Sequence, residues 1–178
     1  MHSKAAVTGV TVSFGERFAA SEQFDAIFKE GMSLVERTAA YLDGSGRKQA
    51  RLLPRPVSVL YSTESMRLTT RLLELASWLM IGRAQKEGEI TAQQARSKRE
   101  RVKLRPSARP SHIKGFADLP QELQRLIEES HALNDRIMRL DRAIEVVAAE
   151  AVGADNPVGA QVTRLEEAFA KPRRALGA

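Results

Sequence analysis

The sequence contains no cysteine, which excludes disulfide bonds, thiolate metal sites and a cysteine nucleophile. Aromatic residues are scarce at 5%, so a core must be built mainly from Leu, Ile, Val, Ala and Met. Alternating runs of β-branched and aromatic residues, which are typical of strands, are almost absent. These absences favour a helical protein over a β-sandwich or barrel, and they fit a reducing cytoplasm.

Long apolar runs are also missing. A membrane-spanning helix needs roughly 20 consecutive apolar residues. The longest apolar run, around residues 75–81, is interrupted by Ser77 and flanked by Glu74 and Arg83. The first twenty residues lack the charged start, apolar centre and cleavage site of a secretory signal. We therefore expect a cytoplasmic protein that stays where it is made.

Positive charge is concentrated in one stretch. The chain has a formal net charge of +6 and a pI of about 10. Residues 96–114 hold eight Lys or Arg side chains and a single acid, so this stretch alone accounts for the excess. It could be a solvated linker, a contact for an acidic protein, or a contact for nucleic acid. It has no aromatic residue for base stacking and no helix-turn-helix spacing, which makes nucleic-acid binding the alternative rather than the first choice.

The first helix is expected after Ser21, which is a good N-cap. Its inner face carries Phe24, Ile27, Leu34 and Tyr41 at helical spacing. Gly31 lies on that same face, where a glycine costs about 1 kcal/mol relative to alanine. We infer that Gly31 allows another helix to approach closely.

Residues 57–86 predict the central helix. Alternating steps of four and three define its apolar seam, which consists of Tyr61, Ser65, Leu68, Leu72, Leu75 and Leu79. A second row of Met66, Leu73 and Met80 lies about 100° round the helix, and Trp78 widens it. Because one seam suffices for a surface helix, the second row predicts core packing or a subunit interface. We predict a dimer interface at Met66, Leu73, Trp78 and Met80.

The second half of the chain predicts two more helices. Thr91 and Gln94 have capping-box spacing, so a short helix is expected over about residues 92–103. From Leu119 to Ala151 the apolar positions keep strict four-three spacing, which predicts shallow, supercoiled packing. The fold class is therefore all-α, an antiparallel three-helix bundle that is dimeric. We expect a flexible segment at 1–17, the bundle at 18–152 with a basic loop at 96–115, and a flexible tail at 153–178.

No arrangement of side chains predicts catalysis. His2, His112 and His131 share no metal-ligand spacing, so no metal is expected. The phosphate-binding motif GxxxxGK[ST] is absent. No nucleophile, base and orienting group assemble along the sequence, so we expect neither enzymatic activity nor a cofactor.

Two segments together carry a resemblance to a known family. Phe14-Gly-Glu-Arg-Phe18 and the long run YSTESMRLTTRLLELASWLMIGRAQKEGEIT from Tyr61 to Thr91 closely resemble the alphaproteobacterial regulator of CtrA degradation (RcdA) family. The match covers residues 14 to about 104, and the last long helix and tail are consistent with it.

The resemblance implies an adaptor for the ClpXP protease that acts in the cell cycle by regulated proteolysis. Family members are helical-bundle dimers that work with ClpX, a CpdR-type response regulator that primes the unfoldase, and the effector PopA. Their substrates include CtrA, and recruitment to a cell pole is a further expectation. The family offers no short ligand signature to transfer, so the partner-binding sites are our own hypotheses from the sequence. They are the basic residues Arg99, Arg101 and Lys103, and the tail residues Leu165, Phe169, Arg173, Arg174 and Leu176.

Overall fold

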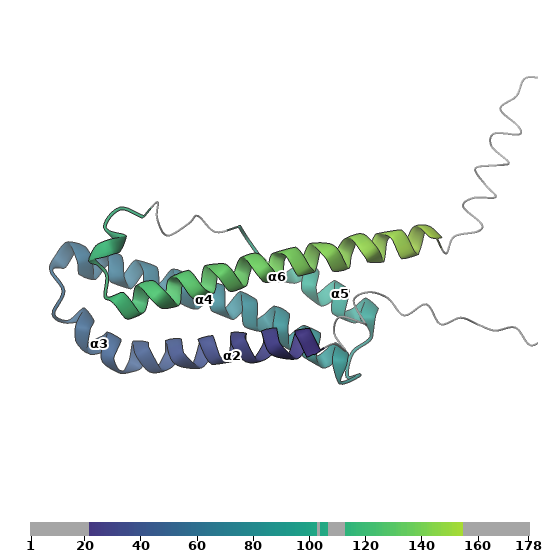
Figure 1. The fold of residues 1–178 in the computed structure, drawn as a ribbon, viewed down its shortest axis with the longest axis horizontal. Helices are drawn as coiled ribbons and strands as arrows, with labels where there is room; N and C mark the ends of the chain where they lie inside the picture. The colour runs from purple at the N-terminus through teal and green to yellow at the C-terminus, as the bar shows by residue number, and fades with distance from the viewer. Residues whose placement is uncertain (1–21, 103, 107–112, 155–178) are drawn as a thin grey trace, which may run out of the picture.

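The computed structural model describes residues 22–102, 104–106 and 113–154 (Figure 1). The helices are α2 (Glu22–Asp43), α3 (Ser45–Ala50), α4 (Arg55–Lys86), α5 (Ala92–Arg101), the 3₁₀ turn η2 (Phe116–Asp118) and α6 (Gln121–Ala154). No strand occurs in these ranges, so the all-α prediction is confirmed for the part of the chain described. None of the helices in these ranges is both long and apolar enough to cross a membrane.

The three long helices α2, α4 and α6 lie side by side, but they are not all antiparallel (Figure 1). α2 runs opposite to α4, since Asp25 near its start pairs with Lys86 at the end of α4. α4 and α6 run in the same direction: Arg71 meets Ser130, and further along Trp78 meets Asp141. The predicted antiparallel arrangement is therefore wrong for this pair. Between α4 and α6 the chain passes from α5, beside the end of α4, to η2, beside the start of α6, as parallel neighbours require (Figure 1).

The seam predicted for each long helix supplies the core. The four-three positions from Leu119, just before α6, to Ile137 on α6 are all buried, including Ser130. The largest fully buried side chains come from all three helices: Phe24 and Leu34 from α2, Leu68, Leu75, Trp78 and Leu79 from α4, and Leu123, Leu126, Ile127, Leu133 and Ile137 from α6. Because α4 contributes buried residues toward both neighbours, it is the central helix of the core.

Two glycines set how closely the helices approach. A Cβ at Gly31 would lie 2.4 Å from Cδ1 of Leu79, which confirms the role inferred for Gly31. A Cβ at Gly82 would lie 2.6 Å from the ring of Phe24, a contact that the sequence analysis missed. Both glycines lie between α2 and α4, so these two helices pack more closely than larger residues would permit.

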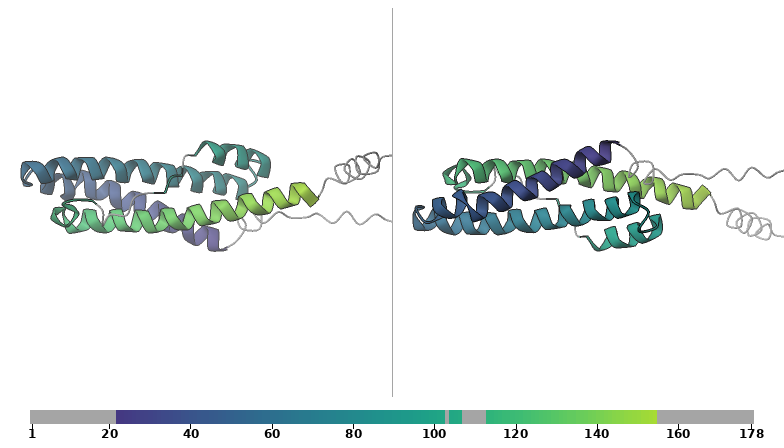
Figure 2. Two further views of the ribbon diagram at one scale, coloured as in Figure 1. Left: turned by 90° about the horizontal axis from the view of Figure 1, so that it is seen from above. Right: turned by 90° about the horizontal axis from the view of Figure 1, so that it is seen from below.

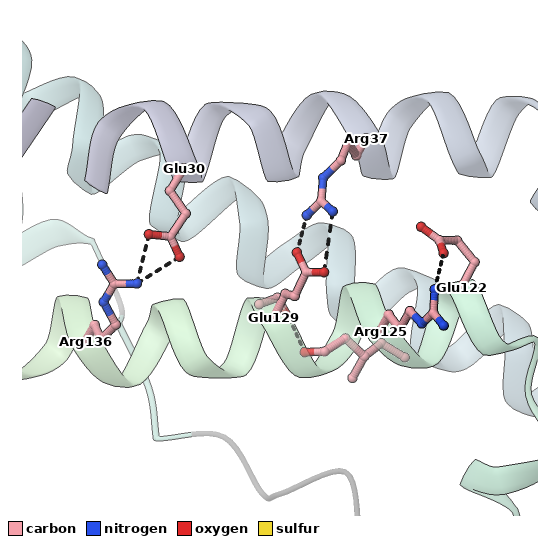
Figure 3. Close-up of polar contacts among 8 residues, drawn as sticks. Glu30, Arg37, Glu122, Arg125, Glu129 and Arg136 are labelled. Carbon is pink, nitrogen blue, oxygen red and sulfur yellow. Dashed lines mark hydrogen bonds and ion pairs between the residues drawn. The ribbon is translucent and has the colours of Figure 1, made fainter. Parts of the chain in front are cut away.

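Exposed ion pairs connect α2 and α6 along their length (Figure 3). Arg136 binds both carboxylate oxygens of Glu30 at 2.8 Å, and Arg37 pairs with Glu129. All four side chains are more than two-fifths exposed. Exposed pairs of this kind contribute about 0–1 kcal/mol each, so they favour the antiparallel register of α2 and α6 more than they stabilise the fold.

After the end of α4 the chain reverses its direction. Gly88 has a φ of 75°, a left-handed conformation that favours glycine. Thr91 and Gln94 then form the predicted capping box at the start of α5. Both views in Figure 2 show α5 folded back beside the last turns of α4. At the other end of the molecule, the short helix α3 lies in the connection between α2 and α4.

Candidate functional site

One face of α4 exposes large apolar side chains in a regular row. Val59, Met66, Leu73 and Met80 occur at every seventh position and are 63%, 72%, 64% and 52% exposed. Seven residues are close to two helical turns, so these side chains lie along one side of the helix. A row of large apolar groups in water is typical of an interaction surface rather than of a free surface. We call these four residues the α4 row.

Hydroxyl side chains beside the α4 row bind their own helix. Thr63, Thr70 and Ser77 donate to the carbonyl oxygens of Val59, Met66 and Leu73, the members of the row four residues earlier, at 2.7–3.0 Å. Ser62 and Thr69 make the same kind of bond. Such bonds satisfy the hydroxyl hydrogens locally. This face can therefore be covered by an apolar partner without leaving those donors unpaired.

An apolar groove continues the α4 row toward α2. It has a volume of about 160 Å³ and is lined by Val35, Thr38, Ala39, Leu42, Thr69, Leu72, Leu73 and Ala76. None of these residues carries a charge. Its position beside Leu73 means that a partner covering the α4 row could also place an apolar side chain in the groove.

Trp78 does not belong to this surface, and its assignment to the dimer interface is wrong. Its side chain is only 2% exposed, and its indole Nε1 donates to Oδ1 of Asp141 at 2.7 Å. Met66, Leu73 and Met80 lie on the exposed side of the helix, as an interface requires. Trp78 is five residues after Leu73, an angle that places it toward α6 instead.

Arg99, predicted to bind a partner, makes contacts within the chain, and its partner-binding role stays a prediction. Its side chain is only 11% exposed, lies 3.7 Å from Asp141, and donates to Gln85 at 3.2 Å. Burial lowers the pKa of Arg99, and the carboxylate of Asp141 offsets part of that effect. Arg99 therefore holds α5 against α4 and α6. We call Arg99, Trp78 and Asp141 the α5 clasp.

The other predicted partner-binding residues stay predictions. Arg101 is exposed at the end of α5. Lys103 and the tail residues Leu165, Phe169, Arg173, Arg174 and Leu176 lie outside the described residues, as do the segment 1–17 and most of the tail.

A second groove, polar in character, lies between α4 and α6. Its volume is about 630 Å³, and Arg71 and Glu64 from α4, His131 from α6 and Arg105 from the connection are among its lining residues. Glu64 is only 2% exposed and binds Arg67 at 2.7 Å. Arg71 donates to Oγ of the fully buried Ser130 at 2.6 Å. These buried polar groups were not singled out in the sequence, where they look like ordinary helix-surface residues.

The titratable side chains of this polar groove shift one another's pKa. Burial, together with the positive charge of Arg71, lowers the pKa of His131 to about 4, so its imidazole is neutral at pH 7. Burial also lowers the pKa of Arg71, with Glu64 acting in the opposite direction. Glu64 is held by Arg67 inside the protein. The residues described here contain no group of three or more His, Cys, Asp or Glu that could hold a metal ion. The groove can therefore bind a charged group. Two of its own charged side chains, Glu64 and Arg67, already pair with each other.

Comparison with known proteins identifies a family model and a related solved structure. A family model described as "Protein of unknown function (DUF1465)" matches residues 15–169. Among solved structures, the crystal structure of RcdA from Caulobacter crescentus CB15 shares 43% sequence identity, with a TM-score of 0.60. The alignment covers 72% of this chain and 96% of that one. No curated protein sequence matches the chain.

Proposed function

The chain belongs to the RcdA family, and on that premise we propose that it is a protease adaptor that delivers cell-cycle regulators such as CtrA to ClpXP. The observation that carries the proposal is the 43% identity to RcdA over 96% of that chain. In this proposal a CpdR-type response regulator primes the unfoldase, and PopA assists with some substrates. The protein would work in the cytoplasm, with recruitment to a cell pole.

An adaptor acts by raising the local concentration of a weakly bound substrate at the protease. Tethering of this kind can raise apparent affinity by about 10²–10⁴ without new contacts to the substrate. It requires a body that holds several binding surfaces at fixed positions. The shared core of α2, α4 and α6 is suited to that task, because α4 contacts both of its neighbours along their length.

We assign the α4 row to a homodimer interface. The four side chains are more than half exposed, and the neighbouring hydroxyls are satisfied within the helix. A two-fold symmetric interface buries the same patch on both subunits, so a row along one helix can pair with itself. The remaining predicted contacts, Arg101 and Lys103 in the basic loop and the tail from Leu165 to Leu176, would serve the protease and its other partners.

Reconstituted proteolysis tests the adaptor function. Purified ClpXP, a primed CpdR-type regulator and candidate substrates are combined with and without the protein, and the degradation rate is measured. We expect the rate to rise with the protein and to depend on the primed regulator. A set of substrates that includes CtrA with PopA, degraded equally fast without the protein, would refute the proposal. Deleting residues 154–178 then tests the tail, since normal delivery by the truncated chain would remove its proposed role.

The dimer proposal has its own test. Met66→Glu with Leu73→Glu places two charges on the α4 row, and we expect sedimentation to show a shift from dimer to monomer. Leu52→Glu is the matched control, because Leu52 is 85% exposed in the turn after α3 and lies outside the row. Dimers that survive the double substitution would contradict the assignment.

Nucleic-acid binding, the alternative function, gains no support from the basic stretch as the structure describes it. Arg99 is engaged in the α5 clasp, and Arg96 pairs with Glu100 at 3.4 Å. These contacts reduce the number of side chains that could neutralise phosphates, on which such binding depends.

A further inference from the structure

We propose that the polar groove between α4 and α6 binds a short acidic peptide segment, with its carboxylates beside Arg105 and Arg71 and a neighbouring apolar side chain against Pro106 and Ile113. This inference rests on the adaptor function and names the chemistry of a segment that the adaptor would hold. The groove is distinct from the α4 row, although Met66 borders both.

Charge is the first reason. Three arginines line the groove, Arg67, Arg71 and Arg105, against two acids, Glu64 and Glu74. Glu64 is almost completely buried and pairs with Arg67, which leaves Arg71 and Arg105 against Glu74. The groove therefore presents a positive surface, and arginine is well suited to bind carboxylates through paired N–H groups.

At the edge of the groove, the backbone of Arg105 is held by a buried side chain of α6. Asn134 is 1% exposed, and its side-chain amide donates to the backbone oxygen of Arg105 at 3.1 Å. Buried polar side chains are retained where they form specific bonds, because an unpaired one costs about 1–3 kcal/mol. This bond holds the backbone of Arg105 against α6, and the guanidinium of Arg71 is anchored on Ser130. Preorganised charges bind a ligand at lower entropic cost than mobile ones.

Shape and lining favour peptide over nucleic acid. The volume of about 630 Å³ lies in the range that holds a drug-sized ligand, and hence a short stretch of peptide. Met66, Pro106 and Ile113 provide apolar surface next to the arginines. Among the described residues that line the groove there is no Phe, Tyr or Trp, the side chains on which nucleic-acid bases stack best. A peptide with an acidic residue next to an apolar residue would match both the arginines and the apolar side chains that line the groove.

The test is a direct binding titration with the full chain and no protease. The probe is a fluorescein-labelled peptide of three Glu-Leu repeats, and the reference is the same peptide with Gln in place of Glu. We expect saturable binding of the acidic peptide only, with a shift in the NMR signals of the His131 ring. Arg105→Glu should weaken binding at least tenfold, and Arg105→Gln less.

Arg125→Glu is the matched control. It makes the same change of charge on the exposed surface of α6, outside the groove, and should alter affinity less than twofold. No binding, equal binding of both peptides, equal weakening by Arg125→Glu and Arg105→Glu, or no shift at His131 would each overturn the proposal. Because the assay contains no protease, its failure would leave the adaptor function to be judged by the degradation experiment.

Discussion

Replacing Asp141 by alanine should remove the central residue of the α5 clasp, together with its contacts to Trp78 and Arg99. Asp141 accepts the indole N–H of Trp78 at 2.7 Å and lies 3.7 Å from Arg99. Trp78 is 2% exposed, so the substitution leaves a buried donor unpaired, at a cost of about 1–3 kcal/mol. The loss of the longer, partly exposed contact to Arg99 adds about 1 kcal/mol or less. The expected loss is about 1–4 kcal/mol, a sizeable share of the 5–15 kcal/mol typical of a domain.

Urea unfolding measures this loss directly. Trp78 is the single tryptophan of the chain, so its fluorescence reports on the clasp itself, while far-UV circular dichroism reports on the helices. Asp141→Asn keeps an oxygen acceptor for the indole but not the charge, and should therefore cost only about 1–2 kcal/mol. Repeating both substitutions with Arg99→Met in a double-mutant cycle isolates the contribution of Arg99.

A loss below about 0.5 kcal/mol for Asp141→Ala would refute the reasoning, since surface substitutions commonly have effects of that size. Equal losses for alanine and asparagine would also contradict it, because the accepted hydrogen bond would then have no measurable value.

Two further predictions concern packing and pH. Gly31→Ala gains about 1 kcal/mol in helix propensity, but its Cβ would lie 2.4 Å from the buried Leu79, and overpacking costs about 1–3 kcal/mol. We expect a net loss on urea unfolding, and a gain would show that α2 and α4 can move apart. For His131, NMR titration of the ring should give a pKa of about 4 rather than 6.5. Between these values the unfolded chain binds a proton that the folded chain does not, so this histidine makes the free energy of unfolding fall as the pH drops from about 6.5 to 4. A ring pKa near 6.5 would show instead that His131 is well solvated.

Much of the helical content was predictable because the spacing of apolar side chains along the sequence is a local property. The four-three spacing identified the buried positions of α6, and the capping box identified the start of α5. Phe24, Ile27, Leu34 and Tyr41 were recognised as one face for the same reason. The direction of packing was not predictable in this way. A heptad seam packs equally well on a parallel or an antiparallel neighbour, and the course of residues 87–120 decided between them.

The same contrast between local spacing and tertiary contact explains which residues of the candidate sites were predicted correctly. Met66, Leu73 and Met80 were found from their spacing, because an apolar row outside the main seam needs cover of some kind. Arg99 was read as a free charge because Asp141, its partner, lies far along the chain and both residue types normally face solvent. The polar groove was missed for the same reason: Glu64 and Arg71 are spaced like ordinary helix-surface residues, and only burial against α6 distinguishes them.

The sequence by itself determined that this chain forms long amphipathic helices, which residues they bury, and the family to which it belongs, since each depends on the order and spacing of residues. Tertiary structure alone decided that α4 and α6 run parallel, that Trp78 and Arg99 face inward, and that arginines from α4 and the connection meet in one groove. Those outcomes depend on which side chains, distant in the chain, come close enough to exclude water from one another.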